Sequence, residues 1–104
     1  MTQAPLVPHD LELVRSVLRQ HPEIESATLF GSRAKGTHTP RSDVDLALAG
    51  PLGALGAAAI AAELEDLPLP YRFDVHALAA ITHGPLLEHI SRVGQVIYRS
   101  GVQP

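Results

Sequence analysis

Two aspartates stand two positions apart in the segment 43–49, which reads DVDLALA. Its alternating start predicts a strand, and alternate side chains of a strand share one face. Asp43 and Asp45 would point the same way, roughly 6–7 Å apart at about 3.3 Å per residue, while Val44 points into the core. Such carboxylates repel each other unless a cation lies between them, and oxygen ligands favour Mg²⁺. Two ions bridged by this pair would suit phosphoryl or nucleotidyl transfer.

A third aspartate stands in a similar pattern in the segment 71–78, which reads YRFDVHAL. Apolar and polar residues alternate there, so Asp74 and His76 would lie on the polar face of a strand. If this strand neighbours the strand 43–49, Asp74 joins the aspartate pair in one cleft. It could then bind a metal ion and accept the proton of an incoming hydroxyl group.

A possible phosphate site precedes the aspartates in the segment 30–36, which reads FGSRAKG. Gly31 allows a ligand to approach the backbone closely, and free amides at the start of a short helix favour an anion. Ser32 adds a hydroxyl donor, and Arg33 and Lys35 add positive charge. A triphosphate here and three carboxylates nearby would need a metal ion between them.

The elements that must position these residues are a succession of helices and strands. Periodic apolar residues, Pro and Gly interruptions and a candidate N-cap at Asp10 indicate their limits. The expected helices cover residues 11–20, 32–36, 52–67 and 86–93, and the expected strands cover residues 24–30, 43–49, 71–78 and 95–98. The short connection from 30 to 43 favours antiparallel neighbours, whereas the helical crossover from 49 to 71 suits parallel ones.

These elements predict an α/β (α+β) fold with a single domain over residues 1–104. We expect a mixed sheet of about four strands, with helices packed mainly on one face. Residues 1–9 contain two prolines and are interpreted as a loose N-terminal leader. The spacing in the last helix indicates core positions at Leu86, Leu87, Ile90 and Val93.

Composition excludes several classes of protein. The chain has 104 residues, no cysteine and a formal net charge of -3. Disulfides and thiolate metal sites are therefore excluded, and the acidic balance argues against a long nucleic acid as partner. No apolar run reaches the roughly 18–20 residues of a membrane span, and the N-terminus lacks the pattern of a signal peptide. We expect a cytoplasmic protein without a membrane partner.

Other phosphate and metal motifs fit the sequence poorly. The segment 31–36 has the glycine spacing of a P-loop, but Thr37 stands where the phosphate-binding lysine must be. An EF-hand fails because Ala47 replaces an oxygen ligand, and a phosphatase of the haloacid dehalogenase type would want Thr or Val there. The histidines other than His76 are interpreted as surface or loop residues; these are His9, His21, His38, His83 and His89.

The combined pattern resembles the signature of the DNA polymerase β-like nucleotidyltransferase superfamily. Gly31 and Ser32 are followed, after an interval of ten residues, by Asp43-x-Asp45, and Asp74 stands on a later strand. The segments 29–36 (LFGSRAKG) and 42–48 (SDVDLAL) are similar to those of the minimal nucleotidyltransferase (MNT) branch. The resemblance covers essentially the whole chain.

The resemblance implies a polymerase β-like fold and a transferase of EC 2.7.7 type that uses a nucleoside triphosphate such as ATP. It also assigns two groups of site residues. The implied triphosphate contacts are Gly31, Ser32, Arg33 and Lys35, and the implied catalytic residues, which hold two Mg²⁺ ions, are Asp43, Asp45 and Asp74. Asp74 would also be the base.

A partner protein is implied as well, because members of this branch are typically encoded with a small helical partner of the HEPN type. The chain would be the catalytic subunit of a two-component transferase, or an antitoxin that adenylylates a ribonuclease toxin; both roles stay open. The alternative is a non-catalytic antitoxin that neutralises its partner by contact. The complete set of carboxylates favours the enzyme.

Overall fold

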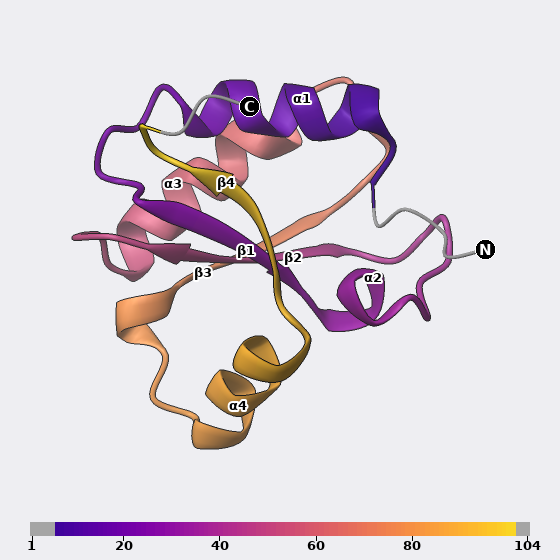
Figure 1. Cartoon of the computed structure of the whole chain (residues 1–104). Coiled ribbons are helices and arrows are strands. Elements are labelled where there is room, and N and C mark those ends of the chain that lie inside the picture. Colours follow the sequence, from indigo (N-terminus) through magenta and orange to yellow (C-terminus); the bar gives the residue numbers. More distant parts are fainter. Residues whose placement is uncertain (1–5, 102–104) are drawn as a thin grey trace.

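A four-stranded mixed sheet crosses the middle of the molecule in this computed structural model, which describes residues 6–101 (Figure 1). The strands lie in the order β3-β2-β1-β4. They are β1 (Ser26–Phe30), β2 (Val44–Ala49), β3 (Phe73–Ala77) and β4 (Gln95–Arg99). The helices are α1 (Pro8–Leu18), α2 (Gly31–Lys35), α3 (Ala54–Glu65) and α4 (Gly84–Val93), with one 3₁₀ turn, η1 (Leu78–Ala80).

Both predicted strand pairings are confirmed. The strands β1 and β2 are antiparallel, and β2 and β3 are parallel. The reason is the length of the connections: a short helix and a loop join β1 to β2, whereas α3 carries the chain back across the sheet before β3. The strand β4 adds to the other edge of β1, antiparallel to it and with a bulge after Ala27.

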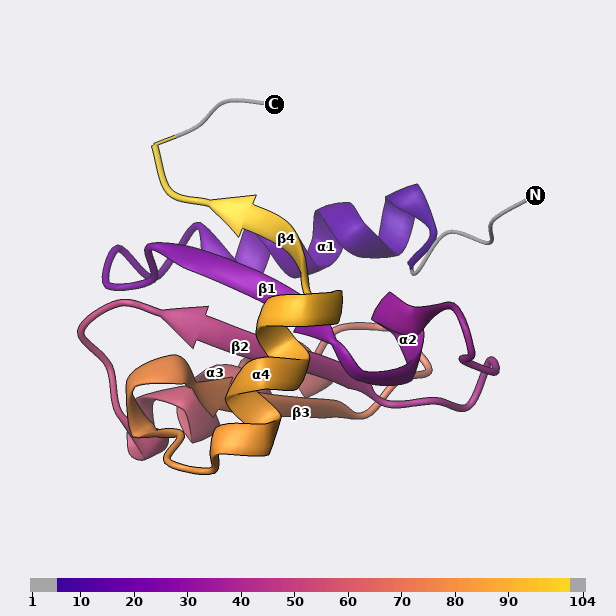
Figure 2. The same cartoon turned by 60° about the horizontal axis from the view of Figure 1, so that its bottom comes forward.

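The larger part of the core lies on one face of the sheet, under α1 and α3, as predicted. Strand β2 supplies three side chains that are completely buried there, Val44, Leu46 and Leu48. The helix α4 packs against the opposite face, where Phe30, Ala47 and Ile90 form a second, smaller cluster. Figure 2 shows α4 in front of the sheet, with α1 and α3 on the other side. The polar residues of β2 and β3 therefore share their face with α4.

The N-terminal part of the fold differs from the prediction. Asp10 is not the N-cap of α1, because Pro8 occupies the first helical position and starts the helix after Val7. The Asp10 side chain instead accepts a hydrogen bond of 2.5 Å from the Tyr71 hydroxyl. Leu6 is buried in the main core, so residues 6–9 are part of the fold and not a loose leader. The rest of that expected leader lies outside the described residues.

The last helix also differs from the prediction at Leu87, and Val93 is only partly buried. Ile90 is buried and Leu86 packs beside it, but Leu87 is exposed on α4. The reason is that α4 contacts only a narrow strip of the sheet, around Phe30 and Ala47.

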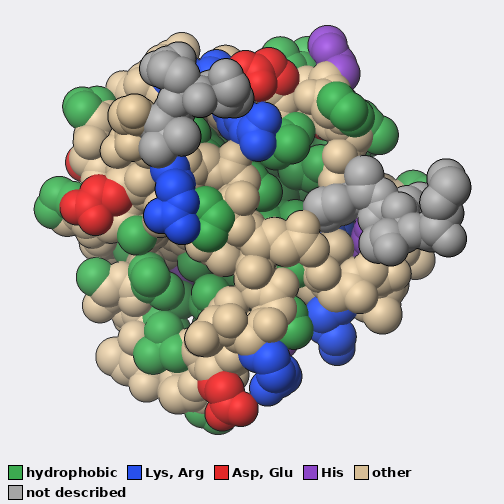
Figure 3. Space-filling model, in the orientation of Figure 1, with side chains coloured by type: hydrophobic (Ala, Val, Ile, Leu, Met, Phe, Trp, Pro, Cys, Tyr) green, Lys and Arg blue, Asp and Glu red, His purple; other side chains and the backbone are tan. Residues whose placement is uncertain are grey.

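The surface shown in Figure 3 carries scattered acidic and basic side chains among apolar ones. Among the coloured side chains of that face, no broad area is basic in the way that binding to a nucleic acid backbone requires. Within residues 6–101, no helix is long and apolar enough to cross a membrane.

Candidate active site

Two of the predicted aspartates face each other across neighbouring strands. Asp45 of β2 is paired in register with Asp74 of β3, and on its other side with Phe30 of β1. The residues that flank Asp45 in β2 are buried in the main core, so its carboxylate points to the face that α4 partly covers. Asp43 is exposed and stands directly before β2. The alternation predicted from the sequence thus places Asp45 and Asp74 on one face.

Asp45 is the least solvated of the three carboxylates. Burial, and after it the neighbouring charges of Asp74 and Asp43, raise its pKa from 3.8 to about 6. His76 and Arg33 oppose the shift. Near neutral pH Asp45 is ionised beside two other carboxylates, so a cation bound among them would relieve their mutual repulsion.

Gly31 makes room for that carboxylate at the end of β1. Its φ angle of 75° lies in the left-handed region, and a Cβ atom built on Gly31 would overlap the Oδ2 atom of Asp45. Only glycine fits both conditions. The turn from β1 into α2 therefore lies directly against the aspartate pair, so the predicted phosphate and metal sites are neighbours.

The predicted phosphate-binding residues are placed in different surroundings. Ser32 is half-buried at the start of α2, and Lys35 is exposed at its end. Arg33 is buried: its guanidinium donates hydrogen bonds to the carbonyl oxygens of Ser42 and Thr39. These bonds tie α2 to the loop that leads into Asp43.

The buried guanidinium of Arg33 also stacks on an aromatic ring. Its central carbon lies 4.6 Å from the centroid of the Tyr71 ring. Burial raises the pKa of Tyr71, and the hydrogen bond from its hydroxyl to Asp10 adds to this effect. Arg33 therefore connects α2, the segment before β3 and, through Tyr71, α1, which gives it a structural role that the sequence prediction did not include.

Two histidines lie beside the aspartates. The Nε2 atom of His76 is 3.1 Å from Oδ2 of Asp74, which confirms that the two side chains share a face. His89 of α4 accepts a hydrogen bond of 3.1 Å from the Gly31 amide through its Nε2 atom. Both imidazole rings contact Phe30, with ring centroids 5.8 Å and 6.1 Å from its own. His89 was expected at the surface, and nothing in its spacing along α4 pointed to this contact.

A divalent cation fits the chemistry of this site. The donors are carboxylate oxygens, which Mg²⁺ prefers, and the negative charges of Asp74 and Asp43 beside Asp45 favour a cation there. Asp43, Asp45 and Asp74 are the residues that would hold the ion. Among the described residues, no three carboxylate, histidine or cysteine side chains are already gathered as a finished metal site.

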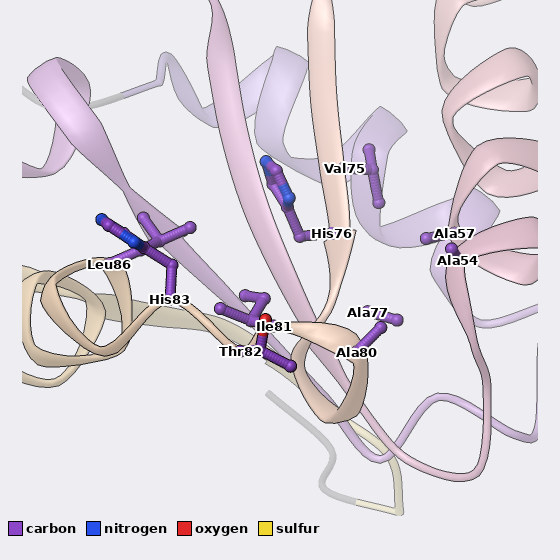
Figure 4. A pocket seen from close by; sticks show the side chains of 10 residues that line it. All are labelled: Ala54, Ala57, Val75, His76, Ala77, Ala80, Ile81, Thr82, His83 and Leu86. Atoms are coloured by element: carbon purple, nitrogen blue, oxygen red, sulfur yellow. The ribbon is translucent and has the colours of Figure 1, made fainter.

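A cavity of about 310 Å³ lies at the carboxyl end of β3. Its wall includes His76, so the cavity and the aspartate face share this side chain. Figure 4 shows His76 on the side of β3 where His83 and Leu86 lie, with Ala54 and Ala57 of α3 on the other side. The cavity was not predicted from the sequence.

The fold and the site together define a nucleotidyltransferase domain: a glycine turn lies against paired strand aspartates on a mixed sheet. Residues 12–101 match the family described as polymerase beta, nucleotidyltransferase. The chain belongs to this family, and the predicted enzyme class is confirmed. A comparison with curated proteins finds no match.

Several solved structures share the fold. A toxin–antitoxin structure with AMP-PNP has a TM-score of 0.72 and 21% identity, covering 92% of this chain and 76% of the other. A re-refined complex of a tri-AMPylated HEPN toxin from Shewanella oneidensis with MNT antitoxin has a TM-score of 0.68 and 18% identity, covering 88% and 71%. A structure of the toxin–antitoxin pair MntA-HepT has a TM-score of 0.67 and 18% identity, covering 88% and 72%.

Proposed function

We propose that this chain is a Mg²⁺-dependent nucleotidyltransferase that moves AMP from ATP to a hydroxyl group of a partner protein or another acceptor. The observation that carries the proposal is the half-buried carboxylate of Asp45, with its raised pKa, its two acidic neighbours and its close approach to Gly31. A strongly perturbed carboxylate beside a glycine turn is typical of a functional site, because it has a cost in stability that only the ligand relieves.

The triphosphate lies at Gly31 and Ser32, with Lys35 near it, and the cation is held by Asp43, Asp45 and Asp74. When bound, Mg²⁺ neutralises the charge of the carboxylates and the phosphates. The paired position of Asp74 opposite Asp45 lets its carboxylate accept the proton of the incoming hydroxyl group. The hydroxyl oxygen bonds to the α-phosphorus, and the bond from that phosphorus to the pyrophosphate oxygen breaks.

Two side chains position these groups without taking part in bond changes. His76 contacts the Asp74 carboxylate at 3.1 Å and limits its rotation. Arg33 holds residues Thr39 and Ser42, and through this loop it fixes where Asp43 enters β2. In this proposal Arg33 acts on the metal ligands through the backbone, and its role at the triphosphate is indirect.

The acceptor is proposed to be delivered by a small helical partner of the HEPN type. The support is the resemblance to the MNT branch, together with the similar fold of the antitoxins in the toxin–antitoxin structures above. In this arrangement the chain acts as the catalytic subunit or as a modifying antitoxin in the cytoplasm.

The test is transfer of radiolabel from the α-phosphate. The protein is incubated with Mg²⁺, each of the four labelled nucleoside triphosphates and lysate from its own source. The test variant is Asp45→Asn. Its matched control is Asp66→Asn, because Asp66 is an exposed carboxylate at the end of α3. We expect a labelled product with the wild type and Asp66→Asn, strongest with ATP, and none with Asp45→Asn. Equal labelling by Asp45→Asn contradicts the proposal.

A second measurement separates the enzyme from a contact antitoxin. The helical partner is captured on the wild-type protein and on Asp45→Asn, and its mass is determined after incubation with ATP. Addition of AMP by the wild type alone supports the transferase. Neutralisation of an unmodified partner by both proteins supports the contact-only alternative.

A further inference from the structure

The cavity at the carboxyl end of β3 shares His76 with the aspartate face and takes no part in the reaction proposed above. We propose that it binds the nucleoside part of the donor nucleotide and selects its base. This inference rests on the proposed function, because it assumes that the triphosphate lies at Gly31 and Ser32.

The order of the residues across the sheet leads from the phosphate turn toward the cavity. Phe30 of β1 is opposite Asp45 of β2, and Asp45 is opposite Asp74 of β3. Gly31 follows Phe30, so the phosphate turn and Asp74 are separated by about two strand spacings, roughly 10 Å. His76 lies one step further along the same face of β3 and lines the cavity. A nucleotide whose phosphates lie at β1 therefore has the cavity within reach of its nucleoside, beyond the aspartates.

The cavity wall is mostly apolar and carries few polar groups. None of the ten lining residues is an aspartate, glutamate, lysine or arginine. Ile81 and Leu86 provide apolar side chains, and the alanines of α3 and η1 leave the space open. The volume of about 310 Å³ and the apolar wall with few polar groups are typical of a small-molecule site. They suit a flat, uncharged base and not a second phosphate group.

Polar side chains of the cavity could discriminate between the bases of different nucleotides. The polar side chains at the rim are His76, Thr82 and His83. Hydroxyl and imidazole groups pair with the edge of a base, and a base with the wrong pattern leaves them unpaired. Such mismatches discriminate more strongly than a difference in size does.

The experiment fills the cavity and compares two ligands. Ala80 lines it and is exposed, whereas Ala79, its neighbour in η1, is exposed and does not line it. Calorimetry with Mg²⁺ measures binding of ATP and of inorganic tripolyphosphate to the wild type, Ala80→Phe and Ala79→Phe. We expect Ala80→Phe to weaken ATP binding by about tenfold or more and to leave tripolyphosphate binding unchanged. Ala79→Phe should bind both ligands as the wild type does.

Each outcome decides between the explanations. Unchanged ATP binding by Ala80→Phe overturns the inference and leaves the cavity to the acceptor. A wild-type protein that binds neither ligand overturns the proposed function itself. If Ala80→Phe also loses tripolyphosphate, its fold is disturbed, and Ala54→Phe, which enters the cavity from α3, decides by the same comparison. Loss of the preference among the four nucleoside triphosphates in the filled variant is the second expected result.

Discussion

The Cα atom of Gly31 lies against the carboxylate of Asp45, so that a Cβ atom on Gly31 would overlap Asp45 Oδ2. This contact joins the turn that is proposed to bind phosphate to the residue that is proposed to bind the cation. It explains why a glycine with positive φ is needed at the end of β1, since a side chain there would displace the carboxylate.

Substitution of Gly31 should therefore stop the reaction. We expect Gly31→Ala to lower nucleotidyl transfer by about 100-fold or more, because a displacement of the order of 1 Å at a catalytic group has this effect. The matched control is Gly36→Ala. Gly36 has a similar φ of 80° but open space around it, so this variant carries the backbone strain without the clash. Comparable loss of activity in both variants would show that strain alone is responsible.

The pKa of Asp45 predicts an unusual dependence of stability on pH. Because its pKa is raised to about 6, the folded protein binds this proton more tightly than the unfolded chain does. The metal-free wild type should lose stability as the pH rises from 3.8 to about 6, and should stay at the lower value above that range. Asp45→Asn has no charge to bury, so it should be more stable near neutral pH by about 1 kcal/mol, after allowance for solvent screening.

Urea denaturation in the presence of a chelator measures the difference in free energy of unfolding between Asp45→Asn and the wild type. It should shrink toward zero as the pH is lowered to about 4, where Asp45 is protonated in the folded protein. Asp66→Asn should stay within about 0.5 kcal/mol of the wild type at every pH. A destabilised Asp45→Asn variant near neutral pH would show that the carboxylate already has a stabilising partner.

Loss of Arg33 should act on the fold. We expect Arg33→Ala to lower the free energy of unfolding by about 2–3 kcal/mol, because it leaves the carbonyl oxygens of Thr39 and Ser42 without this donor. Arg33→Lys should retain only part of this free energy of unfolding, since an ammonium group lacks the planar fork of donors. Thermal and urea unfolding provide the measurement, with Arg41→Ala as an exposed control. If Arg33→Ala unfolds like Arg41→Ala and loses only triphosphate binding, the role of Arg33 lies at the ligand and not in the fold.

His89 should compete with the triphosphate for the Gly31 amide. The imidazole accepts this N–H in the structure, and a phosphate oxygen bound there would have to replace it. We expect His89→Ala to lose about 1 kcal/mol of stability and to bind ATP about fivefold more tightly. Calorimetry and urea denaturation test both effects, with the exposed His9→Ala as control. Weaker binding by His89→Ala would instead identify the imidazole as a ligand of the nucleotide.

The sequence alone determined which acidic side chains share a face of the sheet and the direction of the strands that hold them. Alternation has a period of two residues, so the burial of Val44 and Leu46 necessarily turns Asp45 to the other face. The lengths of the connections determined which strands are antiparallel and which are parallel. These are local properties, and they can be read without knowledge of the neighbouring elements.

The tertiary structure alone decided what surrounds those residues. Arg33 looks like a phosphate ligand in the sequence, yet it is buried against Tyr71, because the loop before β2 folds back over it. His89 meets the Gly31 amide across a separation of 58 residues, and the cavity beyond His76 is formed by α3, η1 and α4 together. Such contacts depend on how α4 packs across the end of β1, and packing between distant elements has no period in the sequence.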